Sequence, residues 1–193
     1  TFHGPMICGR PFQETPDALE ARTFEEALFS TAPLAAITHA DVKIINEGTA
    51  HGRLAGGCLT LVSSSLATNF EIDLKNRIVF LEDVDEKPYR VDRMLTQLIQ
   101  SGRLDQVKGI IFGIMTNCTP PDAAAYGYET PDIEATIREV ITPFAKVKKI
   151  PVICDFPAGH GKLQCTLPIG VEVELVAASG KTELRFLEAA CGI

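Results

Sequence analysis

Two residues of this chain, Glu82 and His160, have the types and the surroundings of a catalytic acid–base pair. Glu82 directly follows Ile78–Leu81, an apolar run typical of a buried strand. His160 follows a second such run, Pro151–Cys154, after a short loop. In α/β folds reactive groups lie at the carboxyl ends of strands, so we expect both side chains at one edge of a sheet. The pattern predicts the base of a nucleophilic triad and the carboxylate that orients it.

Each of these residues also has a simpler explanation. A glutamate at a strand end is more often a solvated acid, and a histidine in a loop is more often not catalytic. Gly159 and Gly161 favour the catalytic interpretation, because they allow the unusual backbone that presents a ring. The acidic run Glu82–Glu86 could instead bind a cation or favour the start of the next helix, but its spacing is not that of a calcium loop.

A nucleophile to complete the triad is missing from the sequence. No serine has the Gly-x-Ser pattern of a nucleophile elbow between a strand and a helix. Cys58 follows a glycine pair and could lie near a helix N-terminus, where a thiolate is favoured. We keep Cys58 as a less favoured nucleophile, so the residues alone predict an incomplete catalytic apparatus, in a chain that we expect to come from a longer polypeptide.

The elements that must position these residues predict one mixed α/β domain. The strand Arg77–Leu81 precedes a helix that opens at Pro88 and carries an apolar stripe, and the strand Gly109–Gly113 follows it, as in a parallel crossover. The chain ends in an expected hairpin that turns at Ser179–Gly180. We also expect a capping box at Thr23 and Glu26, the strand Val42–Ile45, and a helix capped by Thr130–Pro131.

Composition limits the classes of partner. The net charge is −7 and the basic residues are scattered, which disfavours nucleic acids and anionic membranes. No apolar stretch reaches the roughly 18 residues that span a bilayer. The 6 cysteines are far apart, which predicts reduced thiols in a cytoplasmic protein and no zinc site.

Several motifs resemble those of the L,D-carboxypeptidases, also called muramoyltetrapeptide carboxypeptidases. The similarity follows the family's order along nearly the whole chain. The motifs are Phe2–Met6, Gly56–Gly57, Phe80–Leu95, Phe156–Gly161 and Thr166–Gly170.

The resemblance implies a serine peptidase of two domains whose nucleophile lies in the N-terminal domain. It places the family's catalytic histidine at His160 and its glutamate at Glu82; Glu86 is the rival acid, and Glu82 is preferred because it stands at the strand end. Such enzymes remove the terminal D-Ala from murein tetrapeptides during cell-wall recycling in the cytoplasm. The C-terminal domain is of the swivelling β/β/α type, members are commonly homodimers, and no cofactor or metal is expected.

The same resemblance divides the chain into a connector, residues 1–12, and a C-terminal domain, residues 13–193. Two departures from the family's pattern stand out. Cys58 replaces the usual asparagine after the glycine pair, and the segment Thr116–Thr130 is longer than usual.

Two other functions stay open at this stage. One is the microcin-immunity branch of the family, which cleaves an amide in a peptidyl-nucleotide toxin, although Leu81–Val84 looks more like the murein branch. The other is a non-catalytic domain for dimerisation or ligand binding. The non-catalytic function predicts that Glu82 and His160 lie apart, whereas a catalytic pair must lie within hydrogen-bonding reach.

Overall fold

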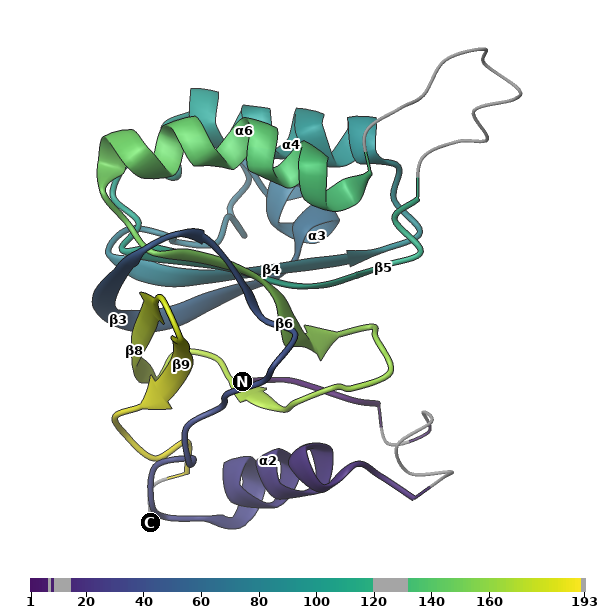
Figure 1. Ribbon diagram of the computed structural model, residues 1–193, viewed down its shortest axis with the longest axis vertical. Coiled ribbons are helices and arrows are strands. Elements are labelled where there is room, and N and C mark those ends of the chain that lie inside the picture. The colour runs from purple at the N-terminus through teal and green to yellow at the C-terminus, as the bar shows by residue number, and fades with distance from the viewer. Residues whose placement is uncertain (7, 9–14, 120–131, 192–193) are drawn as a thin grey trace.

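A seven-stranded mixed sheet forms the centre of the protein, with helices on both sides (Figure 1). The computed structural model describes residues 1–6, 8, 15–119 and 132–191. In their order across the sheet, the strands are β2 (Lys43–Asn46), β6 (Val152–Gly159), β5 (Gly109–Thr116), β4 (Arg77–Val84), β3 (Gly48–Cys58), β8 (Glu172–Ala178) and β9 (Lys181–Phe186).

The four central strands β6, β5, β4 and β3 are parallel, so their carboxyl ends meet at one edge of the sheet. The outer strands β2, β8 and β9 pair antiparallel with their neighbours. α4 (Pro88–Gln100) connects β4 to β5 and α6 (Ile133–Lys148) connects β5 to β6, as crossovers between parallel strands require. The predicted mixed α/β fold with crossover helices and a C-terminal hairpin is confirmed.

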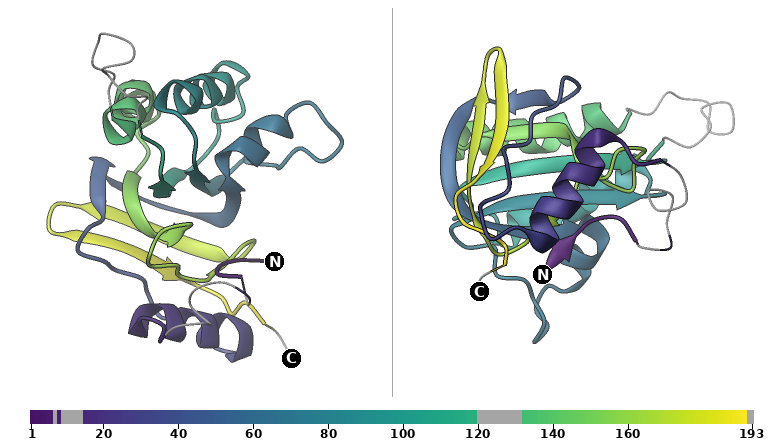
Figure 2. Two further views of the ribbon diagram at one scale, coloured as in Figure 1. Left: turned by 90° about the vertical axis from the view of Figure 1, so that its right-hand side faces the viewer. Right: turned by 90° about the horizontal axis from the view of Figure 1, so that it is seen from below.

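One side of the sheet is covered by α4, α6 and the short helix α3 (Leu59–Ser64), as Figure 1 and the left view of Figure 2 show. The stripe of α4 places Val91, Leu95 and Leu98 in the core with no exposed area. Full burial of each such side chain stabilises the fold by about 1.5–3 kcal/mol. Pro88 opens the helix and Ser101 ends it, as the sequence predicts.

The opposite side carries α2 (Ala18–Phe29) and a two-stranded ladder of β1 (Phe2–His3) and β7 (Leu167–Pro168) (Figures 1 and 2). Within residues 1–12, Phe2 pairs with Pro168 and His3 with Leu167. The ladder therefore fixes the backbone of the first residues beside the main sheet.

Several local predictions differ from the structure. The capping box lies at Asp17 and Glu20 rather than at Thr23 and Glu26, so α2 starts earlier. The long strand β3 was not expected, because its glycines and alternating exposed residues give no apolar run. β2 lies one residue later than predicted.

The strands that carry the two candidate residues are also longer than predicted. β4 continues to Val84, so Glu82 lies inside the strand and not in a loop. β6 continues to Gly159 after an irregular pairing with β5, beside which Asp155 has φ +58°. The predicted cap Thr130–Pro131 lies outside the described residues, and Asp132 caps α6 in its place.

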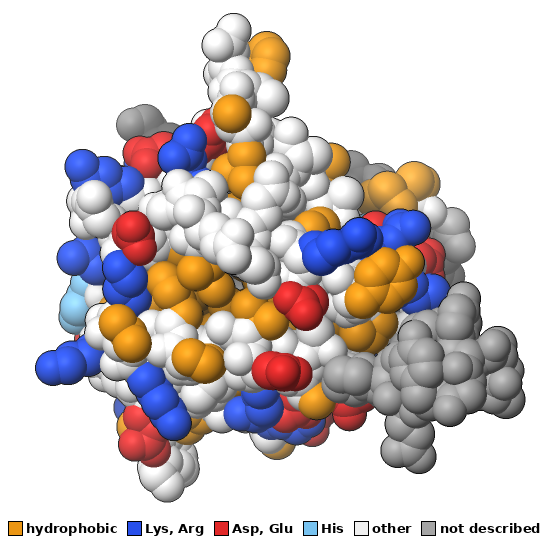
Figure 3. Space-filling model, turned by 90° about the horizontal axis from the view of Figure 1, so that it is seen from above, with side chains coloured by type: hydrophobic (Ala, Val, Ile, Leu, Met, Phe, Trp, Pro, Cys, Tyr) orange, Lys and Arg blue, Asp and Glu red, His pale blue; other side chains and the backbone are white. Residues whose placement is uncertain are grey.

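Charged side chains of both signs are interspersed with apolar ones on the face seen from the helix side (Figure 3). Two large hydrophobic side chains of these helices are exposed, Val147 of α6 and Tyr89 of α4. Within the described ranges, no helix combines the length and the apolar character needed to cross a bilayer.

Candidate active site

Glu82 and His160 meet at the carboxyl ends of the parallel strands. Glu82 lies near the end of β4, opposite Cys58 of β3, and His160 directly follows β6. The Oε2 atom of Glu82 lies 2.7 Å from Nδ1 of His160, which is a short hydrogen bond of the charge-assisted kind. The edge-of-sheet arrangement that the sequence predicts is therefore present, and it joins residues 78 positions apart.

The two partners differ in exposure. The side chain of Glu82 has no exposed area, whereas that of His160 is 51% exposed. Because Nδ1 contacts the buried carboxylate, Nε2 is the ring nitrogen that remains for another group. An imidazole held in this way can exchange a proton with a group that approaches from solvent.

Glycines give the Glu82 side chain room to reach His160, although β5 separates their strands. A Cβ atom at Gly113 of β5 would lie 2.5 Å from the carbonyl oxygen of Ala158 and 3.0 Å from Cβ of Glu82. A Cβ atom at Gly159 would lie 2.8 Å from Oε2 of Glu82, and Gly159 also has φ +114°. Both positions therefore require glycine for the pair to form.

A second imidazole reaches the same carboxylate. Nε2 of His3 lies 3.4 Å from Oε1 of Glu82, on the oxygen that His160 does not use. The His3 ring also meets the ring of Phe80 edge-on, with centroids 4.9 Å apart. His3 was not predicted as a site residue, and its only signal in the sequence is membership of the Phe2–Met6 motif.

The two histidines keep Glu82 ionised. Burial alone would raise the pKa of Glu82, but the hydrogen bonds from His3 and His160 outweigh burial and hold that pKa below its ordinary value. The carboxylate therefore carries its charge at neutral pH, as the stabilisation of a protonated imidazole requires.

The neighbouring acid, Asp83, has a structural environment. Its carboxylate accepts hydrogen bonds from the backbone N–H of Thr60 at 2.9 Å, from the Thr60 hydroxyl at 2.8 Å and from the N–H of Val84 at 2.9 Å. These contacts hold the first turn of α3 against β4.

The other two candidates of the sequence analysis lie in less suitable surroundings. Glu86, the rival acid, precedes α4 and forms an ion pair with Arg90 of that helix, with an N–O distance of 3.4 Å. Cys58 does lie at the N-cap of α3, as expected. However, burial raises the pKa of the Cys58 thiol, and the nearby charges of Asp83 and Glu82 raise it further, which opposes a thiolate there.

Serine side chains lie elsewhere in the fold. The hydroxyl of Ser63 contacts Gln97, and those of Ser64, Ser65 and Ser101 donate to backbone carbonyls of their own helices. Among the described residues, no recorded hydrogen bond joins a serine to His160. The chain's own residues thus form two parts of a triad.

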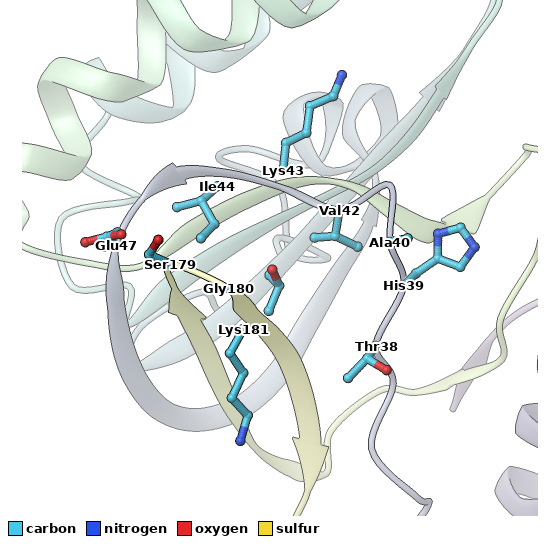
Figure 4. A pocket seen from close by; sticks show the side chains of 11 residues that line it. Thr38, His39, Ala40, Val42, Lys43, Ile44, Glu47, Ser179, Gly180 and Lys181 are labelled. Atoms are coloured by element: carbon cyan, nitrogen blue, oxygen red, sulfur yellow. The ribbon is translucent and has the colours of Figure 1, made fainter.

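Other features of the described residues contain no comparable cluster. None of the 6 cysteines forms a disulfide, and no group of three or more metal-ligating side chains occurs in the part of the chain that the structure describes. An open pocket of about 940 Å³ lies between β2 and the β8–β9 turn (Figure 4). Its lysines point in opposite directions and form ion pairs, Lys43 with Glu134 and Asp155, and Lys181 with Glu183.

The profile of the LD-carboxypeptidase C-terminal domain matches residues 51–175, which include both Glu82 and His160. This chain belongs to that family. The family resemblance predicted from the motifs is therefore confirmed.

Individual relatives agree with this assignment. A probable murein peptide carboxypeptidase of Bacillus subtilis is 32% identical over 92% of this chain and 53% of its own length. The crystal structure of muramoyltetrapeptide carboxypeptidase from Oxalobacter formigenes has a TM-score of 0.77 and 30% identity, covering 97% of this chain and 61% of that one. A MccF-like protein of Bacillus anthracis has a TM-score of 0.63 and 28% identity, covering 79% and 44%.

The chain spans about half the length of the curated relatives it matches, between 53% and 55% for the first three. The swivelling-domain fold that the sequence predicts is the one these structural neighbours share.

Proposed function

We propose that this chain is the C-terminal domain of a serine-type carboxypeptidase that removes the terminal D-Ala from murein tetrapeptides. In this proposal His160 is the general base, Glu82 orients and stabilises it, and a preceding N-terminal domain supplies the serine. The observation that carries the proposal is the 2.7 Å hydrogen bond between a buried carboxylate and a half-exposed imidazole.

The chemistry follows from that geometry. The serine Oγ bonds to the carbonyl carbon before D-Ala while Nε2 of His160 takes the hydroxyl proton. His160 then gives this proton to the D-Ala nitrogen as the C–N bond breaks. Water hydrolyses the resulting ester by the same route, with His160 again taking and returning a proton. The charge of Glu82 stabilises the imidazolium in both steps.

Two further observations support a catalytic domain over a purely structural one. A non-catalytic domain predicts that Glu82 and His160 lie apart, whereas they are in direct contact. In addition, Gly113 and Gly159 leave free the space that the Glu82 side chain occupies on its way to His160, since a Cβ atom at either position would lie 3.0 Å or less from an atom of Glu82.

The test uses the full-length protein and measures D-Ala release from a murein tetrapeptide. We expect His160→Ala to lower kcat by about 10³-fold or more, because the hydroxyl then lacks its base. His51→Ala is the matched control, since His51 lies near the other end of β3 and pairs with Glu174. Normal turnover by His160→Ala would refute the assignment.

Substrate preference distinguishes the proposed murein carboxypeptidase from the microcin-type alternative. The same full-length protein is given the tetrapeptide and an acyl-sulfamoyl nucleotide in competition. Our proposal predicts a higher kcat/KM for the tetrapeptide, and preference for the nucleotide would assign the chain to the microcin branch.

The cytoplasmic location and the homodimer stay predictions, to be tested by cell fractionation and by analytical ultracentrifugation.

A further inference from the structure

His3 contacts the oxygen of the Glu82 carboxylate that His160 does not contact. Among the described residues, the hydrogen bond recorded for Oε1 comes from His3, at 3.4 Å, while Oε2 belongs to His160. The structure therefore shows one buried carboxylate in contact with two imidazoles from distant parts of the chain.

We infer that His3 is a positioning residue for the Glu82–His160 pair. The inference rests on the proposed function, in which His160 is the base. His3 acts by holding the plane of the carboxylate, so that Oε2 stays directed at Nδ1 of His160.

The physical reason is the burial of Glu82. A carboxylate with no exposed area needs a donor for each oxygen, because an unpaired buried oxygen is unfavourable by about 1–3 kcal/mol, and by more when it is charged. Without the His3 donor, Oε1 would recover a hydrogen bond if the carboxylate rotated to bring it toward the His160 N–H or toward water. Either rotation weakens the bond that fixes the tautomer of His160.

His3 is itself held firmly enough to do this. Its backbone pairs with Leu167 in the β1–β7 ladder, and a Cβ atom at the next residue, Gly4, would lie 2.9 Å from the Thr166 hydroxyl. Its ring rests edge-on against Phe80. Contacts to backbone, to a close-packed neighbour and to an aromatic ring thus fix the position of Nε2.

The unpartnered nitrogen of His3 indicates how the ring is used. Nδ1 is buried and has no hydrogen-bond partner. A proton on Nε2 suits this arrangement, because Nε2 can then donate to Glu82, the acceptor that it faces. A ring whose role was packing alone would not need its Nε2 atom directed at a carboxylate.

The test compares two substitutions in the full-length protein. His3→Phe keeps an aromatic ring against Phe80 but removes the donor, whereas His3→Gln places an amide N–H near the position of Nε2. We expect His3→Phe to lower kcat by about 10–100-fold with little change in KM, as for other residues that orient a reactive group. His3→Gln should recover most of that loss, and His51→Phe serves as the control.

A second measurement does not depend on activity. The proton on Nδ1 of His160, in a short bond to a carboxylate, gives a proton NMR resonance far downfield, which ¹⁵N-histidine labelling identifies. His3→Phe should shift this resonance upfield or broaden it, and His3→Gln should preserve it. A packing defect alone would lower the unfolding midpoint without this pattern of rescue.

The outcomes separate the two proposals. If His160→Ala keeps normal turnover, the proposed function is wrong, whatever His3 does. If His160 is essential but His3→Phe retains kcat and the resonance, or if His3→Gln is as impaired as His3→Phe, the positioning role is wrong. If His3→Phe does not fold, His3→Leu and His3→Gln provide the donor-free and donor-bearing pair for the same comparison.

Discussion

At the scale of single residues, adjacent carboxylates on β4 have different roles because strand side chains alternate between the two faces of a sheet. Glu82 points to the side of His160 and His3, and Asp83 points to α3 on the other side. An acidic run that looks uniform in sequence is thus divided by the pleat into a candidate catalytic acid and a helix-anchoring acid.

Glu82→Gln tests the first role. The amide keeps the size of the side chain, but its NH₂ group would face a donor and favour the wrong tautomer of His160. We expect kcat for D-Ala release to fall by about 10³- to 10⁴-fold. Glu86→Gln is the matched control, because Glu86 pairs with Arg90. A larger loss in the control would transfer the acid role to Glu86.

Asp83→Ala tests the second role. The substitution leaves the N–H groups of Thr60 and Val84 without their acceptor in a nearly buried site, so the free energy of unfolding should fall by about 2–3 kcal/mol. Urea denaturation measures this change. Asp92→Ala, on the exposed side of α4, is the control and should change stability by less than about 0.5 kcal/mol. Equal effects of the two substitutions would contradict the anchoring role.

The sequence was sufficient to predict that Glu82 and His160 meet at one edge of the sheet, but not that His3 contacts the same carboxylate. The first two follow apolar runs that predict strands, so their meeting at one sheet edge could be inferred. His3 is brought to Glu82 by the β1–β7 ladder and lies 79 residues from it in the sequence, so no local pattern around His3 indicates this contact.

At the scale of elements, predictability depended on whether the pattern is local. α4 was predicted at both ends because its proline, its apolar stripe and its final Ser101–Gly102 all lie within the helix and its cap. β3 was missed because its glycines give no local apolar run, and its pairing with β4 and β8 on either side is not a local pattern.

The end of β6 provides an element-scale prediction. Gly159→Ala places a methyl group 2.8 Å from Oε2 of Glu82 and also strains a backbone with φ +114°. We expect loss of about 1–3 kcal/mol from the strain, plus displacement of the carboxylate and a fall in kcat. The matched control is Gly170→Ala, where φ is +98° and nothing lies within 4 Å of the new methyl group. If both variants lose stability alike and neither loses activity, the contact with Glu82 does not constrain the pair.

At the scale of the whole molecule, the order of strands could not be obtained from sequence. β3 pairs with β8 from the C-terminal hairpin, and the segment around Ile37 pairs with Leu184 of β9. Such pairings join distant parts of the chain, and several registers would satisfy the same apolar pattern. The class of fold was predictable, because it depends on the sequence of element types and not on which distant strands pair.

Acid stability links the site to the whole molecule. The pKa of Glu82 is lowered by its two histidines, and the pKa values of Glu71, Glu134, Glu183 and Glu188 are lowered by nearby Arg or Lys side chains. A carboxylate with a depressed folded pKa adds stability above its unfolded pKa, about 4.3 for Glu, and loses it as pH falls through the folded value. The free energy of unfolding should therefore fall steadily below about pH 4–5.

High salt distinguishes the contribution of the buried Glu82 carboxylate to acid sensitivity from the contributions of the other carboxylates. The side chains of Glu71, Glu134, Glu183 and Glu188 are 15–40% exposed and their Lys or Arg partners are more so, so about 1 M NaCl should screen much of their contribution. Glu82 is fully buried, so its part of the acid sensitivity should persist in salt. Urea titrations from pH 3 to 7 at low and high salt measure both parts, with Glu82→Gln as the comparison. Suppose that, in high salt, the free energy of unfolding of Glu82→Gln depends on pH as steeply as that of the unaltered protein. The buried Glu82 is then not the source of the remaining pH dependence, and its ionisation is not coupled to folding as the two imidazole contacts require.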